Sequence, residues 1–485
     1  MFVSSAPYSF PYCLHNPDER SKKRPSSEIP DLTDCVPATL YPQPQYFQSL
    51  RNTYLGQNAF PSGCFNVQES IEFPGHLIIE LEKLKLGRGV SLNASSITVS
   101  VNRLIQQRGS ILTGKKYLKI HAGTFGLHAG ILSAPEIVLL IHKLWVTQGG
   151  QIGGKQFIGM GDRWSFDEGI LCADDGITID IGSLGLKSHA LLQALGGAIN
   201  LNVLKNLMME RSGLVADNGL HLLSYDGRIE SEESYFITPR GPLTLHSLGM
   251  HKGKMNKGIR DKGSLFLSKD LNCRAKENIF FTGSYIQGGD LHVLDADTLS
   301  LRGVKMEESL AATFDLSARN HIQIIKGKEQ SVLPVSGKID CQGSLLIKDA
   351  VLGNPSGPLV LYAQKKGTIN CSRLNGSDIH IGTEGIHREN PTEAHIHKEV
   401  DTSIDLHDTQ ITAQAAFKLI ARDVEMKGAA VQAHNITVLI RKTGLFKNSI
   451  ILGQEKISLR GCLLGLDRAG KEQESTGVHI TRSRK

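Results

Sequence analysis

A glycine followed two residues later by an apolar or aromatic residue recurs about every twenty residues in this chain. The clearest units are Gly109/Ile111, Gly130/Leu132, Gly150/Ile152, Gly169/Leu171, Gly263/Leu265 and Gly283/Tyr285. The first four glycines are 21, 20 and 19 residues apart, and the last two are 20 apart. A fixed period of this length is typical of a solenoid, in which each unit buries its apolar face by stacking on its neighbours.

The segments between the glycines have the pattern of short strands. Alternating apolar residues such as Ile177, Ile179 and Ile181 are interrupted by turn-forming Gly, Asn and Asp. The positions two and eight residues after the first four glycines are all apolar or aromatic, which indicates two inward-facing columns. We therefore predict an all-β fold, a parallel β-helix of roughly twenty coils with about 20 residues in each coil.

The repeat also predicts the organisation of the chain. Ten of the 17 prolines lie in the first 75 residues, so we expect residues 1–65 to be an irregular or disordered leader rich in Pro and Tyr. We expect the β-helix to cover residues 70–465. The repeat is interrupted near 225–262 and 384–400, where we predict side loops, and residues 466–485 read as a basic flexible tail.

Composition restricts the class of protein. The net charge of +6 is small for 485 residues, and we expect no nucleic-acid partner. The eight cysteines have no metal-ligand spacing, and we expect neither a structural metal nor a cofactor. No stretch is apolar enough for a transmembrane helix and the N-terminus does not have the pattern of a signal peptide. Free cysteines favour a reducing compartment, so the sequence leaves the localisation open.

Two repeat units resemble the haemagglutinin repeats of filamentous-haemagglutinin and contact-dependent-inhibition exoproteins. They are residues 107–115 (QRGSILTGK) and 148–155 (QGGQIGGK). The resemblance covers about 75–465 and is strongest over 104–182. It implies a right-handed parallel β-helix that acts at a bacterial surface or after secretion, as an adhesin or a toxin-presenting shaft.

We therefore expect a non-enzymatic scaffold for adhesion, surface presentation or interaction with a host cell, with a protein or glycan surface as partner. The alternative is a carbohydrate-active enzyme, a polysaccharide lyase or glycosidase, because such enzymes also use β-helices and need gathered carboxylates. Its candidate residues are Asp162, Asp167, Glu168, Asp174 and Asp175. These carboxylates do not share one column of the repeat, and Asp174-Asp175-Gly176 has the composition of a turn.

Two sets of residues are weaker candidates for a metal site. His121, His142 and Asp162 each lie twelve residues after a repeat glycine, so they occupy one predicted column on consecutive coils. His395 and His397 alternate as on a strand and would point the same way. We interpret both sets as polar surface residues. A further alternative function is a β-helix that forms filaments by end-to-end self-association.

Overall fold

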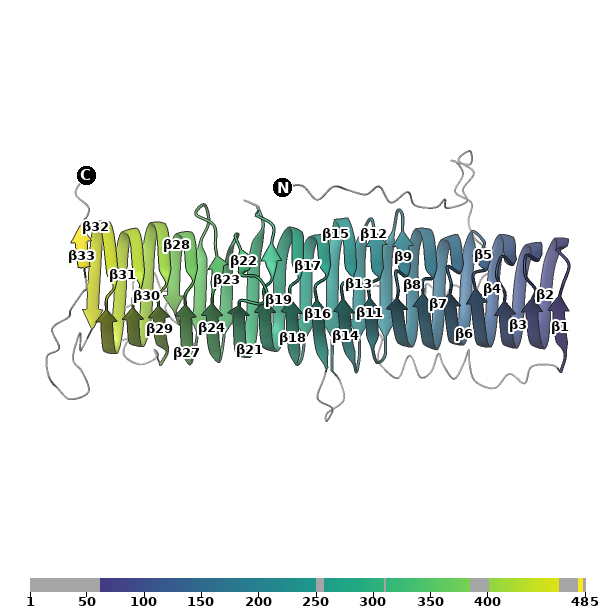
Figure 1. Cartoon of the computed structure of the whole chain (residues 1–485), viewed down its shortest axis with the longest axis horizontal. Coiled ribbons are helices and arrows are strands. Elements are labelled where there is room, and N and C mark those ends of the chain that lie inside the picture. Colours follow the sequence, from purple (N-terminus) through teal and green to yellow (C-terminus); the bar gives the residue numbers. More distant parts are fainter. Residues whose placement is uncertain (1–61, 250–256, 309–310, 384–400, 462–478, 483–485) are drawn as a thin grey trace.

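The computed structural model describes residues 62–249, 257–308, 311–383, 401–461 and 479–482. These residues form strands and no helix, and the parallel strands stack as a β-solenoid of about 18 turns. Figure 1 shows the result as an elongated rod with the strands side by side along its length. The predicted all-β solenoid with coils of about 20 residues is confirmed.

The strands run in chain order from one end of the rod to the other. The first half of the rod contains β1 (Cys64–Val67), β2 (Ile71–Leu86), β3 (Ser91–Gln106), β4 (Ile111–His128), β5 (Ile131–Ser133), β6 (Glu136–Thr147), β7 (Gln151–Asp167), β8 (Ile170–Lys187), β9 (Leu191–Ala194), β10 (Ala198–Val203), β11 (Leu207–Glu210), β12 (Gly213–Ala216), β13 (Gly219–Ser224), β14 (Arg228–Glu232), β15 (Tyr235–Ser247) and β16 (Gly258–Lys262). The second half contains β17 (Leu265–Ala275), β18 (Asn278–Thr282), β19 (Tyr285–Arg302), β20 (Lys305–Met306), β21 (Thr313–Ile325), β22 (Ser331–Leu333), β23 (Ser336–Cys341), β24 (Ser344–Lys348), β25 (Ala350–Leu352), β26 (Leu359–Ala363), β27 (Lys366–Asn370), β28 (Arg373–Gly382), β29 (Ser403–His407), β30 (Gln410–Lys427), β31 (Ala430–Lys447), β32 (Ile450–Gly461) and β33 (His479–Arg482).

Each coil contains three straight runs separated by bends. Between β7 and β8 the parallel register is interrupted twice, so residues 170–173, 176–181 and 183–187 of β8 pair as three separate runs. We call the surfaces formed by the equivalent runs of all coils the first, second and third face. The first bend lies between the first and second faces, and the second bend lies between the second and third faces. The third bend connects the third face to the first face of the next coil.

The core is a continuous apolar column inside these faces. Alternate residues such as Leu171, Ile177 and Leu184 point inward and are almost completely buried. One hydrophobic cluster extends from Val67 to Ile451. Burying each such side chain stabilises the fold by roughly 1.5–3 kcal/mol, so the stacked coils stabilise one another.

The repeat glycines belong to two neighbouring columns. Gly109, Gly263 and Gly283 have φ values of 70°, 71° and 66° and occupy a left-handed turn at the third bend. Gly130, Gly150 and Gly169 lie one position later, in a column of small residues that includes Ser110 and Ser284.

This difference corrects the predicted register. Leu132, Ile152 and Leu171 are inward as expected, but Ile111 pairs with Ile131, and Leu265 pairs with Tyr285, on the outer surface. In the units of Gly109, Gly263 and Gly283, the inward residue lies one position after the predicted one.

The structure also differs from the side loop predicted over 225–262. In the described residues, β14, β15 and β16 of this stretch pair with their neighbours as ordinary strands of the solenoid. The glycine signal is missing at the start of this stretch because Glu233, with a φ of 49°, occupies the left-handed turn and Ser234 the small-residue column, and Ser234 and Ser264 are 30 residues apart. Only residues 250–256 of the predicted loop lie outside the described residues.

The ends differ in detail from the predicted boundaries. β1 begins at Cys64, so the solenoid starts slightly before residue 70, and β33 lies within the stretch predicted as a flexible tail and pairs with β32. Residues 1–61 of the predicted leader and the whole predicted loop 384–400 lie outside the described residues.

One carboxylate lies inside the core. Asp261 occupies an inward position of β16 and accepts hydrogen bonds from the hydroxyls of Ser231 and Ser284 and from the backbone N–H of Ser264. Burial raises the pKa of Asp261, although these hydrogen bonds act in the opposite direction. The core therefore contains a polar site whose hydrogen-bonding groups are satisfied by serines of the neighbouring coils.

The two tryptophans of the chain have opposite environments. Trp164 is buried, and its indole N–H donates to the backbone carbonyl of Ile141 at 2.9 Å. Glycines make room for the ring, since a Cβ atom on Gly159 would lie 2.3 Å from Trp164 Cη2. Trp145 points outward from the neighbouring coil and is 40% exposed.

We predict that Trp164→Ala lowers the stability of the rod by about 3–5 kcal/mol, because it leaves a cavity in the core. Trp145→Ala is the matched control and should change the midpoint of thermal unfolding very little. Circular dichroism during heating measures both effects. Equal destabilisation by the two substitutions would contradict the inward and outward assignment of these side chains.

Candidate functional site

The five carboxylates of the enzyme hypothesis lie at three different bends of the coil. Asp162 is between the second and third faces, Asp167 is the last residue of the third face and Glu168 follows it, and Asp174 and Asp175 lie between the first and second faces. Glu168 has a φ of 60° and occupies the left-handed turn position. The structure therefore does not gather these side chains on one face.

Two of the three residues in the predicted histidine column are in direct contact. His142 Nδ1 lies 2.8 Å from Asp162 Oδ2 on the next coil. His121 is displaced, because it pairs with Leu140 on the second face. Burial, with the nearby charges of His142 and Lys119, lowers the pKa of His121.

In the part of the chain that the structure describes, no group of three or more His, Cys, Asp or Glu side chains is arranged to hold a metal ion. His395 and His397 lie outside the described residues. The arrangement of the other candidates is a hydrogen-bonded His142–Asp162 pair with His121 on the adjacent second face.

The second face carries a column of outward side chains that are nevertheless shielded from solvent. We call this column the outer strip, and its members are His121, Leu140, Met160, Asp180, Asn202, Leu223 and His246. Leu140, Met160, Asp180 and Leu223 are each at most 8% exposed. Val138, Leu140 and Met160 form a small apolar cluster separate from the main core.

Asp180 is the buried acid of the outer strip. It lies between Met160 and Asn202, and Asn202 Nδ2 donates to Asp180 Oδ1 at 2.6 Å. Burial raises the pKa of Asp180 to about 6, although the hydrogen bond from Asn202 opposes the shift. The outer strip therefore changes its charge just below neutral pH.

We predict a specific pH dependence for Asp180→Asn. Because folding raises the pKa of Asp180 from 3.8 to about 6, its favourable contribution is complete below pH 3.8 and is lost as the pH rises through 6. Between pH 4 and pH 7 the wild-type protein should therefore lose about 2 kcal/mol of stability relative to the variant. Unfolding measured in parallel over this range tests the prediction. A stability difference that does not change with pH would contradict it.

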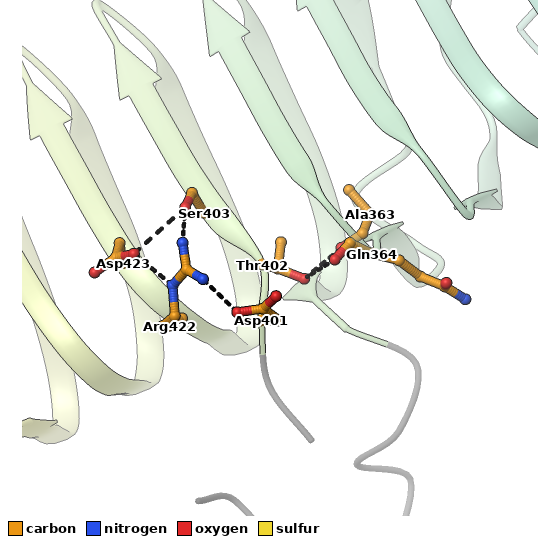
Figure 2. Close-up of polar contacts among 7 residues, drawn as sticks. All are labelled: Ala363, Gln364, Asp401, Thr402, Ser403, Arg422 and Asp423. Carbon is orange, nitrogen blue, oxygen red and sulfur yellow. Dashed lines mark hydrogen bonds and ion pairs between the residues drawn. The ribbon is translucent and has the colours of Figure 1, made fainter. Parts of the chain in front are cut away.

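An ion-pair network surrounds Arg422 on two neighbouring coils (Figure 2). Its guanidinium donates to Asp401 and, at 2.7 Å, to Asp423, and a longer hydrogen bond of 3.5 Å reaches Ser403. Since the arginine side chain is partly exposed, the network contributes modestly to stability.

Thr402 fixes the backbone beside this network. Its buried hydroxyl donates to the carbonyls of Ala363 at 2.6 Å and Gln364 at 3.1 Å (Figure 2). These contacts hold the start of the coil that contains β29, directly after residues 384–400. We interpret them as structural contacts of the solenoid.

Sequence reasoning missed the outer strip and the exposed Trp145. A signal for the strip was available, since the run 137–141 (IVLLI) is apolar at every position instead of alternating. Trp145 lies between inward Leu144 and Val146, so strict alternation would have placed it on the outside.

No protein-family model, curated protein or solved structure matches this chain. The fold and the side chains on its faces are therefore the basis for any functional conclusion. Among the described residues we find no helix with the length and apolar character that crossing a membrane requires.

Proposed function

We propose that this protein is a non-enzymatic β-helical scaffold that presents its outer faces to a protein or glycan surface, in adhesion, surface presentation or contact with a host cell. The observation that supports it is the register of the outward side chains, which form columns along successive parallel coils. The resemblance of two repeat units to haemagglutinin repeats is consistent with this role.

A solenoid suits such a function for a physical reason. Coils about 4.8 Å apart hold outward side chains at a constant spacing, so the binding surface is ordered before a partner arrives. An extended partner can then contact several coils at once, and many weak contacts combine into firm binding.

Binding of the purified full-length protein to arrays of glycans and of cell-surface proteins tests the proposal. We expect saturable binding to one class of surface and no chemical change in that partner. Catalytic turnover of a bound glycan would contradict a non-enzymatic role.

The enzyme alternative makes a different prediction for Asp174 and Asp175. If the protein is a scaffold, incubation with acidic polysaccharides should release no new reducing ends or unsaturated products, with or without added Ca²⁺. The double substitution Asp174→Ala/Asp175→Ala would then give the same background level of product as the wild type. Product release by the wild type that disappears in this double variant would favour a lyase or glycosidase instead.

A second candidate function is end-to-end assembly, and the first coil supplies the observation that favours it. Phe65, Ile71 and Phe73 pair with inward residues of the next coil, yet they are 36–42% exposed. They therefore form an apolar end surface of the core within the described residues. The last coil of a second copy would cover this surface with the same parallel stacking that joins all internal coils, and such a head-to-tail contact generates filaments.

For this second candidate, we predict that Phe73→Glu blocks assembly, because it places a charge in the proposed contact between copies. Ile78→Glu is the matched control, since Ile78 is on the same strand, is 59% exposed and points sideways from the rod. Sedimentation velocity over a wide concentration range measures the effect. A wild-type protein that stays monomeric at all concentrations would exclude end-to-end assembly.

A further inference from the structure

Trp145 occupies an unusual position on the third face. It lies on β6 between Leu144 and Val146, which are fully buried, so its indole points away from the core. At 40% exposure it presents a large apolar ring to solvent. An exposed tryptophan on a regular sheet face is a feature of binding surfaces, because its burial by a partner is strongly favourable.

The neighbours of Trp145 in its column are small. Gly126 precedes it and Ser165 follows it, and Gly185 is the next residue beyond Ser165. A Cβ atom added to Gly185 would meet only Ser165 Oγ, at 3.9 Å. The side of the indole that faces Ser165 therefore borders an open, shallow floor formed by two small residues.

The other side of the indole is more enclosed. A Cβ atom on Gly126 would lie 2.8 Å from His128 Nε2, so the imidazole covers this glycine. The ring of His128 is held by a contact of 2.8 Å between its Nδ1 and Thr147 Oγ1. The surface around Trp145 is thus a step, with the indole as the wall and Ser165 and Gly185 as the floor.

Charged side chains border this step on both sides. Lys143 and Arg163 are exposed and in register on the coils of Trp145 and Ser165. On the opposite border, Asp167 pairs with Lys187 on the next coil, and both are exposed. Three cations against the two exposed carboxylates Asp167 and Glu168 leave the surroundings of the floor with a net positive charge.

These features define the chemistry of a ligand. The C–H face of a sugar ring packs on an indole, and the small floor admits the ring beside it. Arginine recognises a carboxylate by paired hydrogen bonds, while Asp167 and Ser165 are suited to sugar hydroxyls. A phosphate backbone fits less well, because Asp167 would repel it and the step offers a single stacking ring.

We propose that Trp145, Ser165 and Gly185, with Lys143, Arg163 and Asp167 around them, form a binding site for an acidic saccharide chain built from uronic acids. This inference rests on the proposed scaffold function and specifies one partner for it. The saccharide lies across neighbouring coils, with one ring against the indole and its carboxylate toward Arg163.

Titration of the full-length protein with oligogalacturonate, followed by tryptophan fluorescence and calorimetry, tests the site. We expect saturable binding that quenches the exposed indole and weakens with added salt. Trp145→Ala should weaken binding about tenfold or more, and Arg163→Gln should weaken it while reducing its dependence on salt. Gly185→Leu should also block binding, because it fills the floor without changing the charge.

Tyr285→Ala is the matched control. Tyr285 is an aromatic residue on the first face of β19, several coils away, and is exposed to the same degree as Trp145, so its loss should leave the affinity unchanged. Met208 does not serve as a control, because it follows Gly185 in the same column and borders the floor. A wild-type affinity for oligogalacturonate that is unaffected by Trp145→Ala would overturn the proposal.

Three further results would also overturn it. They are equal binding of a neutral oligosaccharide, tighter binding of single-stranded DNA that depends on Trp145, and absence of oligogalacturonate binding. If the protein still binds another glycan or protein surface, the scaffold function stands and only this site is rejected. Turnover of the saccharide would instead reject the scaffold function itself.

Discussion

The parallel backbone ladder between successive coils is the constraint on which the structure depends. Every coil must turn at the same place. Two coils use two left-handed residues at the third bend, Gln148 with Gly149 and Ser188 with His189, whereas the coil of Gly109 uses one. The N–H group of Gly109 donates to the next coil, through a bond of 2.8 Å to the carbonyl of Ala129. Glu168 and His189 adopt the same conformation, with φ values of 60° and 70°. Since a left-handed non-glycine residue costs of order 1–2 kcal/mol, the ladder outweighs local preference at these positions.

This constraint explains how far the sequence predicts the fold. The glycine period was sufficient for the class of fold and the length of the coil. It was not sufficient for the register, because Gly109 belongs to the turn and Gly130 to the small-residue column beside it. It also failed at Glu233 and Ser234, where neither the turn nor the small-residue column holds a glycine, since serine is small enough for that column but carries no recognisable signal.

The candidate site was predictable only where the bends keep the coil length constant. His142 and Asp162 are 20 residues apart and meet as expected. His121 falls two positions out of their column. One position arises because Gly109 lies in the turn, directly before the column of Gly130, and the other because the first bend of its coil contains Lys115 and Lys116, whereas the next coil bends at Pro135 alone. A difference of one residue at a bend shifts all later residues of the coil relative to the next coil. A repeat length averaged over several coils does not show such a shift.

Inward positions determine the shape of the protein, whereas outward positions are available for binding. Inward residues are mostly apolar, and the inward carboxylate of Asp261 is hydrogen-bonded to serines, whereas outward residues tolerate any side chain that remains solvated. On the third face, the outward charged residues differ along the length of the rod. This face carries Lys143 and Arg163 toward its N-terminal end and Asp405, Asp423 and Glu425 toward its C-terminal end. Asp405 and Asp423 are ion-paired with Lys366 and Arg422, so these carboxylates are already balanced by cations. An anionic chain would therefore bind by preference near Lys143 and Arg163, and the outward side chains select the place of binding as well as the ligand.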